Sequence, residues 1–279
     1  QARGPGSPGR MCRLLGIIAS EPTEFRSVLR GSGRSLAALS HEHRDGWGLA
    51  VHDSGDPSPV ANGAGWRLHK AAACAAEDEN FRRLASAHGE LMLWHIRRRT
   101  VGRVGTENTH PFRSGRWVFA HNGTIHDDGY LRARVSRTRL SELRGSTDSE
   151  LFFAYLLSEM DAAGLTHEAA SSATDRVLRD AVGRACATPS FGAANFLLSD
   201  GTALYAHRRG RTLFLLERGP THDARPTRRH RDGVIVVTRW SRDRRAVLIA
   251  SEAMTNEPWK PIEEGSLVRV DRAPTTGAP

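Results

Sequence analysis

Cysteine is scarce in this chain of 279 residues: only Cys12, Cys74 and Cys186 occur, and no two of them form a CxxC pair. An odd number of widely spaced cysteines argues against both a disulfide framework and a zinc ribbon. His41 and His43 have no cysteine or carboxylate at metal-ligand spacing, so we expect them at the surface or at the edge of a pocket, with no metal site and no cofactor. Cys74 lies in an alanine-rich run and Cys186 in an apolar, helix-like stretch, and both are expected to be small buried side chains.

Long hydrophobic runs and lysines are also missing. No run of 18 apolar residues occurs and the first residues lack the apolar core of a signal peptide, so we expect a cytoplasmic protein without a membrane span. Lys70 and Lys260 are the only lysines, and the net charge of +9 is carried by arginines scattered among acidic residues. A nucleic-acid groove gathers its cations on one element, so no nucleic-acid partner is expected. The densest basic stretch, residues 225–231, contains Pro and His and indicates a surface loop.

The domain organisation follows from the distribution of Gly and Pro. Residues 1–10 are rich in both and show no apolar period, which predicts a disordered tail. A second short tail is expected at residues 273–279. Residues 11–272 contain no linker long enough to divide them and no internal repeat, so they are expected to form one domain of ample size for a buried core.

Apolar patterning predicts a mixture of helices and strands within that domain. Helical spacing is found at residues 25–39, 77–88, 148–160 and 167–186, and residues 148–160 are expected to be amphipathic. Strand-like runs occur at residues 14–19, 48–52, 90–96, 117–120, 193–198, 203–207, 212–216, 234–238, 246–250 and 267–270. Residues 54–64 read as a loop, residues 121–123 as a tight turn, and residues 199–201 and 208–210 as hairpin turns. Helices together with a strand-rich C-terminal third indicate the α+β class.

Cys12 is distinguished by its position directly after Met11. A cysteine at the first position of a mature chain can use its own α-amino group, with an unperturbed pKa near 8, as the base for its thiol. The following residues 13–18 provide a strand that would hold the thiol in the core. This requires that translation begins at Met11, which is then removed, or that residues 1–11 are cleaved. The alternative is that Cys12 is a small core residue of the first strand.

Three further groups have the chemistry that such a nucleophile needs. An arginine at position 97 could bind a carboxylate with two parallel hydrogen bonds, or be one of three consecutive solvated arginines. The Asn122 amide and the Gly123 N–H could stabilise an oxyanion, although Asn-Gly is also a common hairpin turn. Asp148 could bind a ligand ammonium, cap a helix, or do both. His110 and His121 read as structural histidines rather than acid–base catalysts.

Six short motifs occur in a fixed order along the chain: MCRLLG at residue 11, HRDGWG at 43, HIRRRT at 95, NTHPF at 108, AHNG at 120 and TDSE at 147. A seventh stretch, TNEPW at 255, is followed by Ile262 and Gly265. In this arrangement the chain resembles the class II glutamine amidotransferases, and most closely the stand-alone members related to the amidohydrolase of ergothioneine biosynthesis. The resemblance covers residues 11–272. It implies the four-layer αββα sandwich of the N-terminal nucleophile hydrolases.

The resemblance also implies a role for each matching residue. Cys12 would be the nucleophile, its α-amino group the general base, and Asn122 with the Gly123 N–H the oxyanion hole. Arg97 would bind the α-carboxylate of the substrate and Asp148 its α-ammonium group. Supporting positions in the pocket would be Thr100, His110, Asp45, Gly46, Trp47 and Gly48.

The implied function is hydrolysis of a γ-glutamyl amide, either glutamine or a γ-glutamyl conjugate, through a Cys12 thioester. Class II amidotransferases usually deliver ammonia to a synthase domain, and none follows in this sequence. The chain would therefore work with a separate synthase subunit or hydrolyse γ-glutamyl amides outright. The alternative is a non-catalytic domain that binds a γ-glutamyl ligand or regulates a partner on the same fold.

Overall fold

The computed structural model describes residues 12–25, 27–52, 65–86, 88–219, 227–231, 234–238 and 245–272. The tails expected at residues 1–10 and 273–279, Met11 and the loop expected at 54–64 lie outside these residues. The strands are β1 (Arg13–Glu24), β2 (Gly46–His52), β3 (Trp66–Ala71), β4 (His88–Arg97), β5 (Phe112–Ser114), β6 (Trp117–Ile125), β7 (Gly192–Ser199), β8 (Ala203–His207), β9 (Phe214–Arg218), β10 (Thr227–Arg231), β11 (Val234–Thr238), β12 (Ala246–Ala250), β13 (Lys260–Pro261) and β14 (Leu267–Asp271). The helices are the π-helix η1 (Ser27–Gly31), α1 (Leu36–Ser40), α2 (Glu79–Leu84), the 3-10 helix η2 (Thr106–Asn108), α3 (Gly129–Arg132), α4 (Arg137–Ser141), α5 (Asp148–Ala162) and α6 (Ser172–Cys186).

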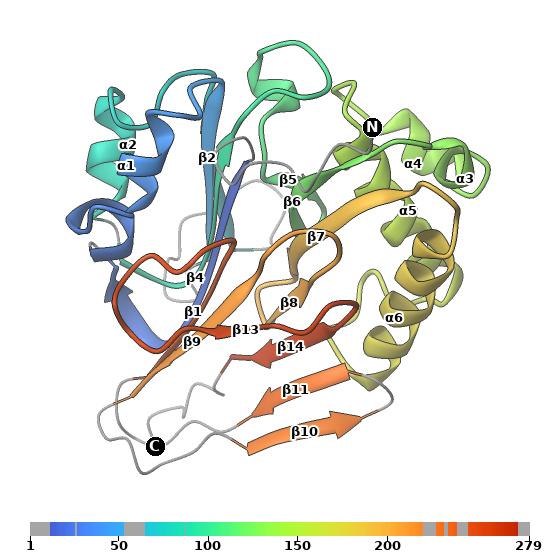
Figure 1. Ribbon diagram of the computed structural model, residues 1–279. Coiled ribbons are helices and arrows are strands. Elements are labelled where there is room, and N and C mark those ends of the chain that lie inside the picture. Colours follow the sequence, from blue (N-terminus) through green and yellow to red (C-terminus); the bar gives the residue numbers. More distant parts are fainter. Residues whose placement is uncertain are drawn as a thin grey trace, which may run out of the picture.

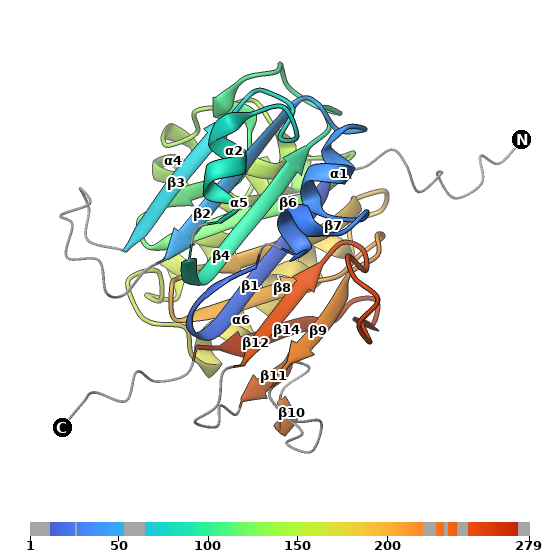
Figure 2. The same ribbon diagram turned by 90° about the vertical axis from the view of Figure 1, so that its left-hand side faces the viewer.

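Two seven-stranded sheets form the centre of the molecule. Sheet A has the strand order β13-β9-β12-β1-β4-β2-β3, and sheet B has the order β10-β11-β14-β8-β7-β6-β5. The pairs are antiparallel except for β11 with β14. Figure 1 shows the sheets between two layers of helices, with α1 and α2 outside sheet A and α5 and α6 outside sheet B. In Figure 2, α1 and α2 lie in front of sheet A. This confirms the α+β class and the four-layer arrangement.

Strand alternation explains the three hydrophobic cores between these four layers. On β1, Leu14 and Ile18 join the core between the sheets, whereas Leu15 and Ile17 join the core between sheet A and its helices. Successive residues of a strand point to opposite faces, so a strand buried on both faces is apolar at nearly every position. The third core lies between sheet B and helices α5 and α6, and Phe119 of β6 belongs to it.

Helix α5 is buried on nearly all sides, not on one face as expected for an amphipathic helix. Its apolar residues pack in the core shared with sheet B and α6, and smaller helices contact it from the other side. Thr147 caps its N-terminus by accepting a hydrogen bond from the backbone N–H of Glu150. Helix α6 begins at Ser172, later than expected, because Ser171 and Thr174 form a capping box.

Several expectations about local structure are wrong. The helix expected at 25–39 is divided into η1 and α1 by the turn at residues 32–35. The helix expected at 77–88 spans only α2, and its last residue already belongs to β4. Residues 121–123 form no turn, because β6 continues to Ile125 and pairs with β7 along this length. The turn at 199–201 does join the hairpin β7–β8, but residues 208–210 carry the chain from sheet B to sheet A.

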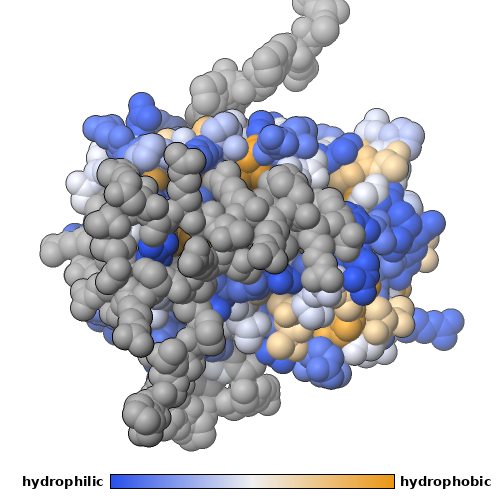
Figure 3. All heavy atoms as spheres, turned by 90° about the horizontal axis from the view of Figure 1, so that it is seen from below, coloured by the Kyte–Doolittle hydropathy of each residue, from blue (hydrophilic) through white to orange (hydrophobic). Residues whose placement is uncertain are grey.

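The surface of the described region is mainly polar. Residues 227–231 of the basic stretch are strand β10, not a loop. Figure 3 shows one face of the molecule, where hydrophilic side chains predominate outside the grey atoms. Among the described residues, Val104 is the one large hydrophobic side chain that is exposed. No helix in that part of the chain is long and apolar enough to cross a membrane.

Candidate functional site

The predicted site residues gather at one end of the space between the two sheets. Alternation places Cys12 on the same face of β1 as Leu14, which belongs to the inter-sheet core. It places Arg97 on the same face of β4 as Leu93, and Asn122 on the same face of β6 as Ala120. Strands β1 and β4 are neighbours in sheet A, whereas β6 belongs to sheet B. The site is therefore formed by strand ends of both sheets that face each other.

Backbone groups of Arg98 hold the Cys12 thiol. The Arg98 N–H donates to Cys12 Sγ at 3.2 Å, and Sγ lies 3.2 Å from the Arg98 carbonyl oxygen, to which the thiol donates. Burial raises the pKa of Cys12, while the Arg98 N–H and the nearby Arg97 guanidinium act in the opposite direction. A thiol with a raised pKa is protonated at neutral pH, so it needs a base to become a nucleophile.

Arg97 is buried, so it is not one of a row of solvated arginines. Its exposed fraction is 3%, while Arg98 is half-buried and Arg99 is exposed. The two terminal nitrogens of Arg97 each donate at 3.0 Å to a backbone carbonyl of the following loop, those of Arg103 and Val101. A guanidinium has five N–H donors. The remaining donors of Arg97 can still bind a carboxylate next to Cys12.

The loop after β4 is fixed by side chains from several elements. Asp45 accepts a hydrogen bond of 2.8 Å from the Arg99 N–H. Asn108 donates to the carbonyl of Arg103 and accepts from the Ser146 N–H. These bonds connect the loop that follows Arg97 to the start of β2 and to the segment that enters α5. Thr100, at the centre of this loop, is exposed.

Within the described residues, no strand pairs with β6 at Gly123 on the side away from β7. Strand β5 pairs with β6 between residues 117 and 119, and no other described strand continues this edge. The Ile125 N–H on this edge donates to Asp148 Oδ2 at 2.7 Å instead of to a strand. Alternate residues of a strand direct their N–H groups to the same side, so the Gly123 N–H faces this edge too.

Asn122 and Gly123 are fixed by the pairing of β6 with β7. Asn122 is buried to 3% exposure, and its side-chain amide forms no hydrogen bond within the described part of the chain. A Cβ atom on Gly123 would overlap the carbonyl oxygen of Ala193 on β7. Glycine is thus required here by close packing against the neighbouring strand.

Asp148 is not the N-cap of α5, because Thr147 has that position. Asp148 is the first residue of the helix, and its Oδ2 accepts from the Ile125 N–H. Its second carboxylate oxygen has no hydrogen bond among the described residues, so it is available to a ligand. The positive end of the helix dipole stabilises a carboxylate at this position.

Buried histidines surround the site, and two of them were not assigned a role from the sequence. His43 was expected at the surface or the pocket edge, but it is fully buried. The rings of His95 and His110 lie 4.2 Å apart. Neither ring nitrogen of His43 or His110 has a hydrogen-bond partner among the described residues. Burial lowers the pKa of His43 to about 4 and that of His95 to about 3, and it lowers that of His110 well below 6.5. All three rings are neutral at pH 7.

His121 has a structural role, as expected. Its Nε2 lies 3.0 Å from the carbonyl oxygen of Ala193, and its Nδ1 lies 2.8 Å from Ser149 Oγ. A carbonyl can only accept, so Nε2 carries the proton and Nδ1 accepts from the serine hydroxyl. Both nitrogens are therefore satisfied in the neutral ring, which leaves none free for proton transfer.

The predicted supporting positions lie on both faces of β2. Gly46 and Gly48 face sheet B, and a Cβ atom on Gly48 would overlap the carbonyl oxygen of His110. Trp47 faces the helices outside sheet A, where its indole N–H donates to Asp78 Oδ2 at 2.9 Å. Gly48 is thus the position at which the loop carrying His110 reaches sheet A.

A cleft of about 880 Å³ opens where β3 and β5 meet α4 and α5. The Lys70 ammonium lies 5.2 Å from the centre of the Phe112 ring, and burial lowers its pKa to about 8. Lys70 and Arg97 both disfavour protonation of His110. Phe112, which lines the cleft, also contacts the His110 ring, with 4.5 Å between the ring centres.

The position of His95 beside the site could have been inferred from the sequence. His95 and Arg97 are separated by two positions on one strand, so alternation alone places them on the same face. The contact of the Arg98 backbone with Cys12 had no such signal, because it depends on how β1 and β4 pair, with Arg13 opposite Ile96.

Comparisons with known proteins identify the family of this chain. The family described as glutamine amidotransferases class-II matches residues 11–277. A Haemophilus influenzae protein named "Putative glutamine amidotransferase" is 28% identical over 272 residues, which cover 92% of this chain and 83% of that protein. A crystal structure of a predicted glutamine amidotransferase from Pseudomonas aeruginosa is 28% identical, with a TM-score of 0.59, over 92% of this chain and 96% of that one.

A more distant structure shares the fold. Glutamine phosphoribosylpyrophosphate amidotransferase from B. subtilis is 18% identical, with a TM-score of 0.59, over 93% of this chain and 47% of that one. At this identity the likeness shows the fold alone.

Proposed function

Because the chain belongs to the class II glutamine amidotransferases, we propose that it hydrolyses a γ-glutamyl amide through a thioester on Cys12. Hydrolysis of the glutamine amide in general is supported by the family. The observation that carries the proposal is the Cys12 thiol between the N–H and carbonyl groups of Arg98, next to buried Arg97, on the side of sheet A that faces β6 across the inter-sheet core.

The first step is attack of Cys12 on the γ-carbonyl carbon. In the proposed active form residues 1–11 are absent, and the free α-amino group of Cys12 takes the thiol proton. Sγ forms a bond to the carbon, and the carbonyl electron pair becomes an oxyanion. The Asn122 amide and the Gly123 N–H donate to this oxygen, and such preorganised donors stabilise it more than they stabilise the substrate.

The second step expels the amine. The α-ammonium group of Cys12 returns its proton to the leaving nitrogen, the carbon–nitrogen bond breaks, and a thioester remains. Water then attacks the thioester with the α-amino group again as base, which releases glutamate and restores the thiol. Ammonia or an amine leaves as a free product, or passes to a separate synthase subunit.

The amino-acid end of the substrate is held by charge. Arg97 would bind the α-carboxylate with the donors it does not use on its own loop, and the free oxygen of Asp148 would bind the α-ammonium group. Thr100 and His110 would complete this part of the pocket, with Asp45 and the residues up to Gly48 as its support. Two opposite charges at a fixed separation select an α-amino acid over a simple amide.

A pair of chains that differ at one end tests the proposal. One begins with Cys12, and the matched control carries a single glycine before it, so that the α-amino group of Cys12 becomes an amide. Ammonia release from glutamine is measured for both. A general base contributes roughly 10²–10⁴-fold, so the control should lose at least about 100-fold in kcat.

Two outcomes would contradict the proposal. Equal rates for the two chains would exclude the α-amino group as the base. Binding of glutamine without turnover in the chain that begins with Cys12 would instead identify the alternative, a binding or regulatory domain.

A further inference from the structure

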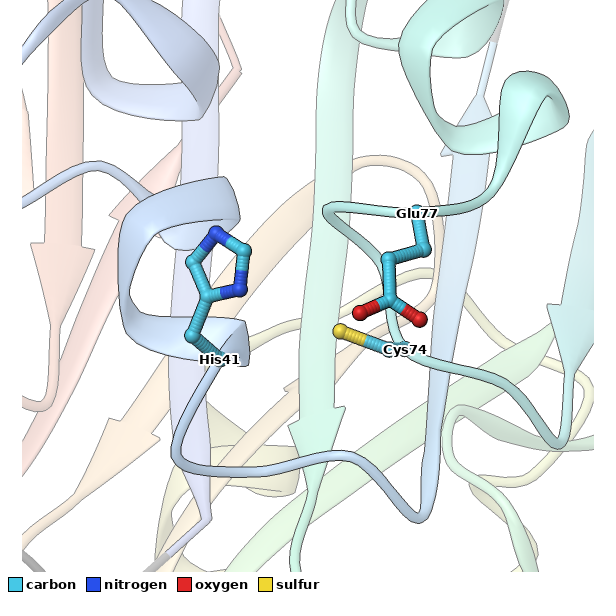
Figure 4. Close-up of side chains that lie close together, drawn as sticks. All are labelled: His41, Cys74 and Glu77. Atoms are coloured by element: carbon cyan, nitrogen blue, oxygen red, sulfur yellow. The ribbon is translucent and has the colours of Figure 1, made fainter.

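Three side chains with metal-binding atoms meet outside sheet A, away from the inter-sheet site. His41 is the C-cap of α1, and Cys74 and Glu77 belong to the turn before α2. One ligand atom from each residue lies within 4.8 Å of the other two. Figure 4 shows that the three side chains converge from these two segments. The cysteine is buried, whereas the histidine and the glutamate are exposed, so an ion could reach the cluster from solvent.

The donor set corresponds to the ligands that zinc prefers. Thiolate sulfur, imidazole nitrogen and carboxylate oxygen bind Zn²⁺ at about 2.0–2.3 Å in tetrahedral sites. The three ligand atoms lie within 4.8 Å of one another, so small movements of the two segments suffice to bring them to the distances of a tetrahedral site. Both are short loops or helix ends, which can move by this amount without disturbing a strand.

The existing partners of these side chains compete only weakly with a metal ion. The Cys74 thiol lies 3.5 Å from the carbonyl oxygen of Ser40 and 3.8 Å from its hydroxyl oxygen, which are long contacts. Glu77 forms an ion pair of 2.5 Å with Arg44, and both side chains are more than half exposed. Exposed ion pairs contribute little to stability, so a metal can displace Arg44 at small cost.

We propose that His41, Cys74 and Glu77 bind one zinc-class divalent ion, with a water molecule as the fourth ligand. Binding requires the thiolate and the neutral imidazole, so the thiol proton is released to solvent and affinity increases with pH. The ion would join the end of α1 to the turn before α2. Asp78, next to Glu77, caps α2 and accepts a hydrogen bond from the indole of Trp47. Asp45 lies four positions after His41 in the sequence. The ion would therefore restrict the movement of the segments that carry Asp45 and Trp47, which support the active site.

Cobalt titration provides a direct test. The Cys12→Ala variant is used, so that the proposed nucleophile does not contribute a thiolate. Co²⁺ is added to this protein, and a thiolate-to-cobalt charge-transfer band together with the visible bands of a tetrahedral ion is recorded. We expect both with one equivalent of Co²⁺, and we expect Zn²⁺ to displace them, since Zn²⁺ does not absorb in this range and usually binds more tightly than Co²⁺.

Four further variants in the same background locate the site. Cys74→Ala should abolish the charge-transfer band, whereas the matched control Cys186→Ala, at the other buried thiol, should retain it. His41→Ala should weaken binding at least about tenfold, and because this residue is exposed, the variant should fold even if Cys74→Ala does not. Arg44→Ala should strengthen binding, since it removes the competitor for Glu77.

The proposal fails if no charge-transfer band appears. It also fails if the band survives Cys74→Ala or is lost in Cys186→Ala. Equal affinity of the His41→Ala variant and its parent would overturn it as well, whatever the behaviour of the other variants. None of these results depends on catalysis, so the outcome is independent of the proposed reaction.

Discussion

Acid should destabilise this fold strongly between pH 6.5 and pH 4.5, because several of its histidines are buried as neutral rings. His43 and His95 have no exposed surface, and His207 on β8 is exposed to 3%. Burial lowers the pKa of His95 to about 3 and the pKa values of His43 and His207 to about 4. In the unfolded chain each of these residues has its ordinary pKa of about 6.5.

The direction of the effect follows from proton binding. Between pH 6.5 and the lowered pKa, the unfolded chain binds a proton at each residue and the folded chain does not, so the free energy of unfolding decreases as pH decreases. Above pH 6.5 these histidines are neutral in both the folded and the unfolded chain, so they do not reduce the free energy of unfolding. At pH 4.5 each neutral buried histidine has lowered the free energy of unfolding by roughly 2–3 kcal/mol, so the three together have a large effect. Domains of ordinary stability have about 5–15 kcal/mol in total, so the fold should be near its limit at this pH.

One substitution isolates the effect from carboxylate titration. The Nδ1 of His207 donates to the carbonyl of Ala194 at 2.9 Å, and a glutamine amide can also donate there without titrating. Urea unfolding followed by circular dichroism gives the free energy of unfolding at pH 7 and pH 4.5. In His207→Gln the decrease between these pH values should be smaller than in the parent by roughly 2–3 kcal/mol.

The matched control is His88→Gln, at an exposed position at the start of β4. It should show the same decrease as the parent chain. If His207→Gln also loses stability in parallel with the parent, then His207 is not held neutral by burial, and the reasoning is refuted.

Three further substitutions address the site and its packing. Arg97→Lys keeps the charge but loses the two-pronged donor, so KM for glutamine in initial-rate assays should rise at least about tenfold, and an unchanged KM would mean that the carboxylate is bound elsewhere. Asn122→Ala removes one oxyanion donor and should reduce kcat by roughly 10²–10³-fold with little change in glutamine affinity; an unaltered kcat would remove Asn122 from the oxyanion hole. Gly48→Ala brings a methyl group against the His110 carbonyl and should cost about 1–3 kcal/mol in urea unfolding. The control Gly183→Ala, in a helix with open space around the new methyl group, should stabilise by about 0.5–1 kcal/mol, and similar effects of the two substitutions would refute the packing argument.

Much of the secondary structure could be predicted from local pattern. The strands at 203–207, 234–238 and 246–250 have the predicted bounds, because each is a short apolar run between polar or turn residues. Local pattern failed where long-range pairing overrides it. Asn122-Gly123 has the composition of a turn, yet the pairing of β6 with β7 keeps it extended. The turn at 208–210 was recognised, but the sheet that the next strand joins depends on packing of the whole molecule.

The candidate site was predictable in its residues and less so in its geometry. Ordered motifs indicated Cys12, Arg97 and Asn122, and alternation brings all three to the inter-sheet space. The two hydrogen bonds between the Arg98 backbone and the Cys12 thiol could not be predicted, because they depend on the register of β1 against β4. The burial of His43 was also missed, since its neighbours in sequence are charged and only the tertiary structure shields it. The catalytic roles of these residues remain predictions.

Covalent labelling tests the central claim most directly, namely that Cys12 is the nucleophile. The chain beginning with Cys12 is inactivated with a diazo-oxo-norleucine, a glutamine analogue with an electrophilic carbon at the γ-side, and the labelled cysteine is identified by peptide mapping. We expect one label, on Cys12, and none on Cys74 or on Cys186, because Cys74 is buried and burial raises the pKa of Cys186 to about 11. Glutamine should protect against labelling, and Cys12→Ala should be folded, unlabelled and inactive. A label on Cys74 or Cys186, with Cys12→Ala still hydrolysing glutamine, would contradict the account.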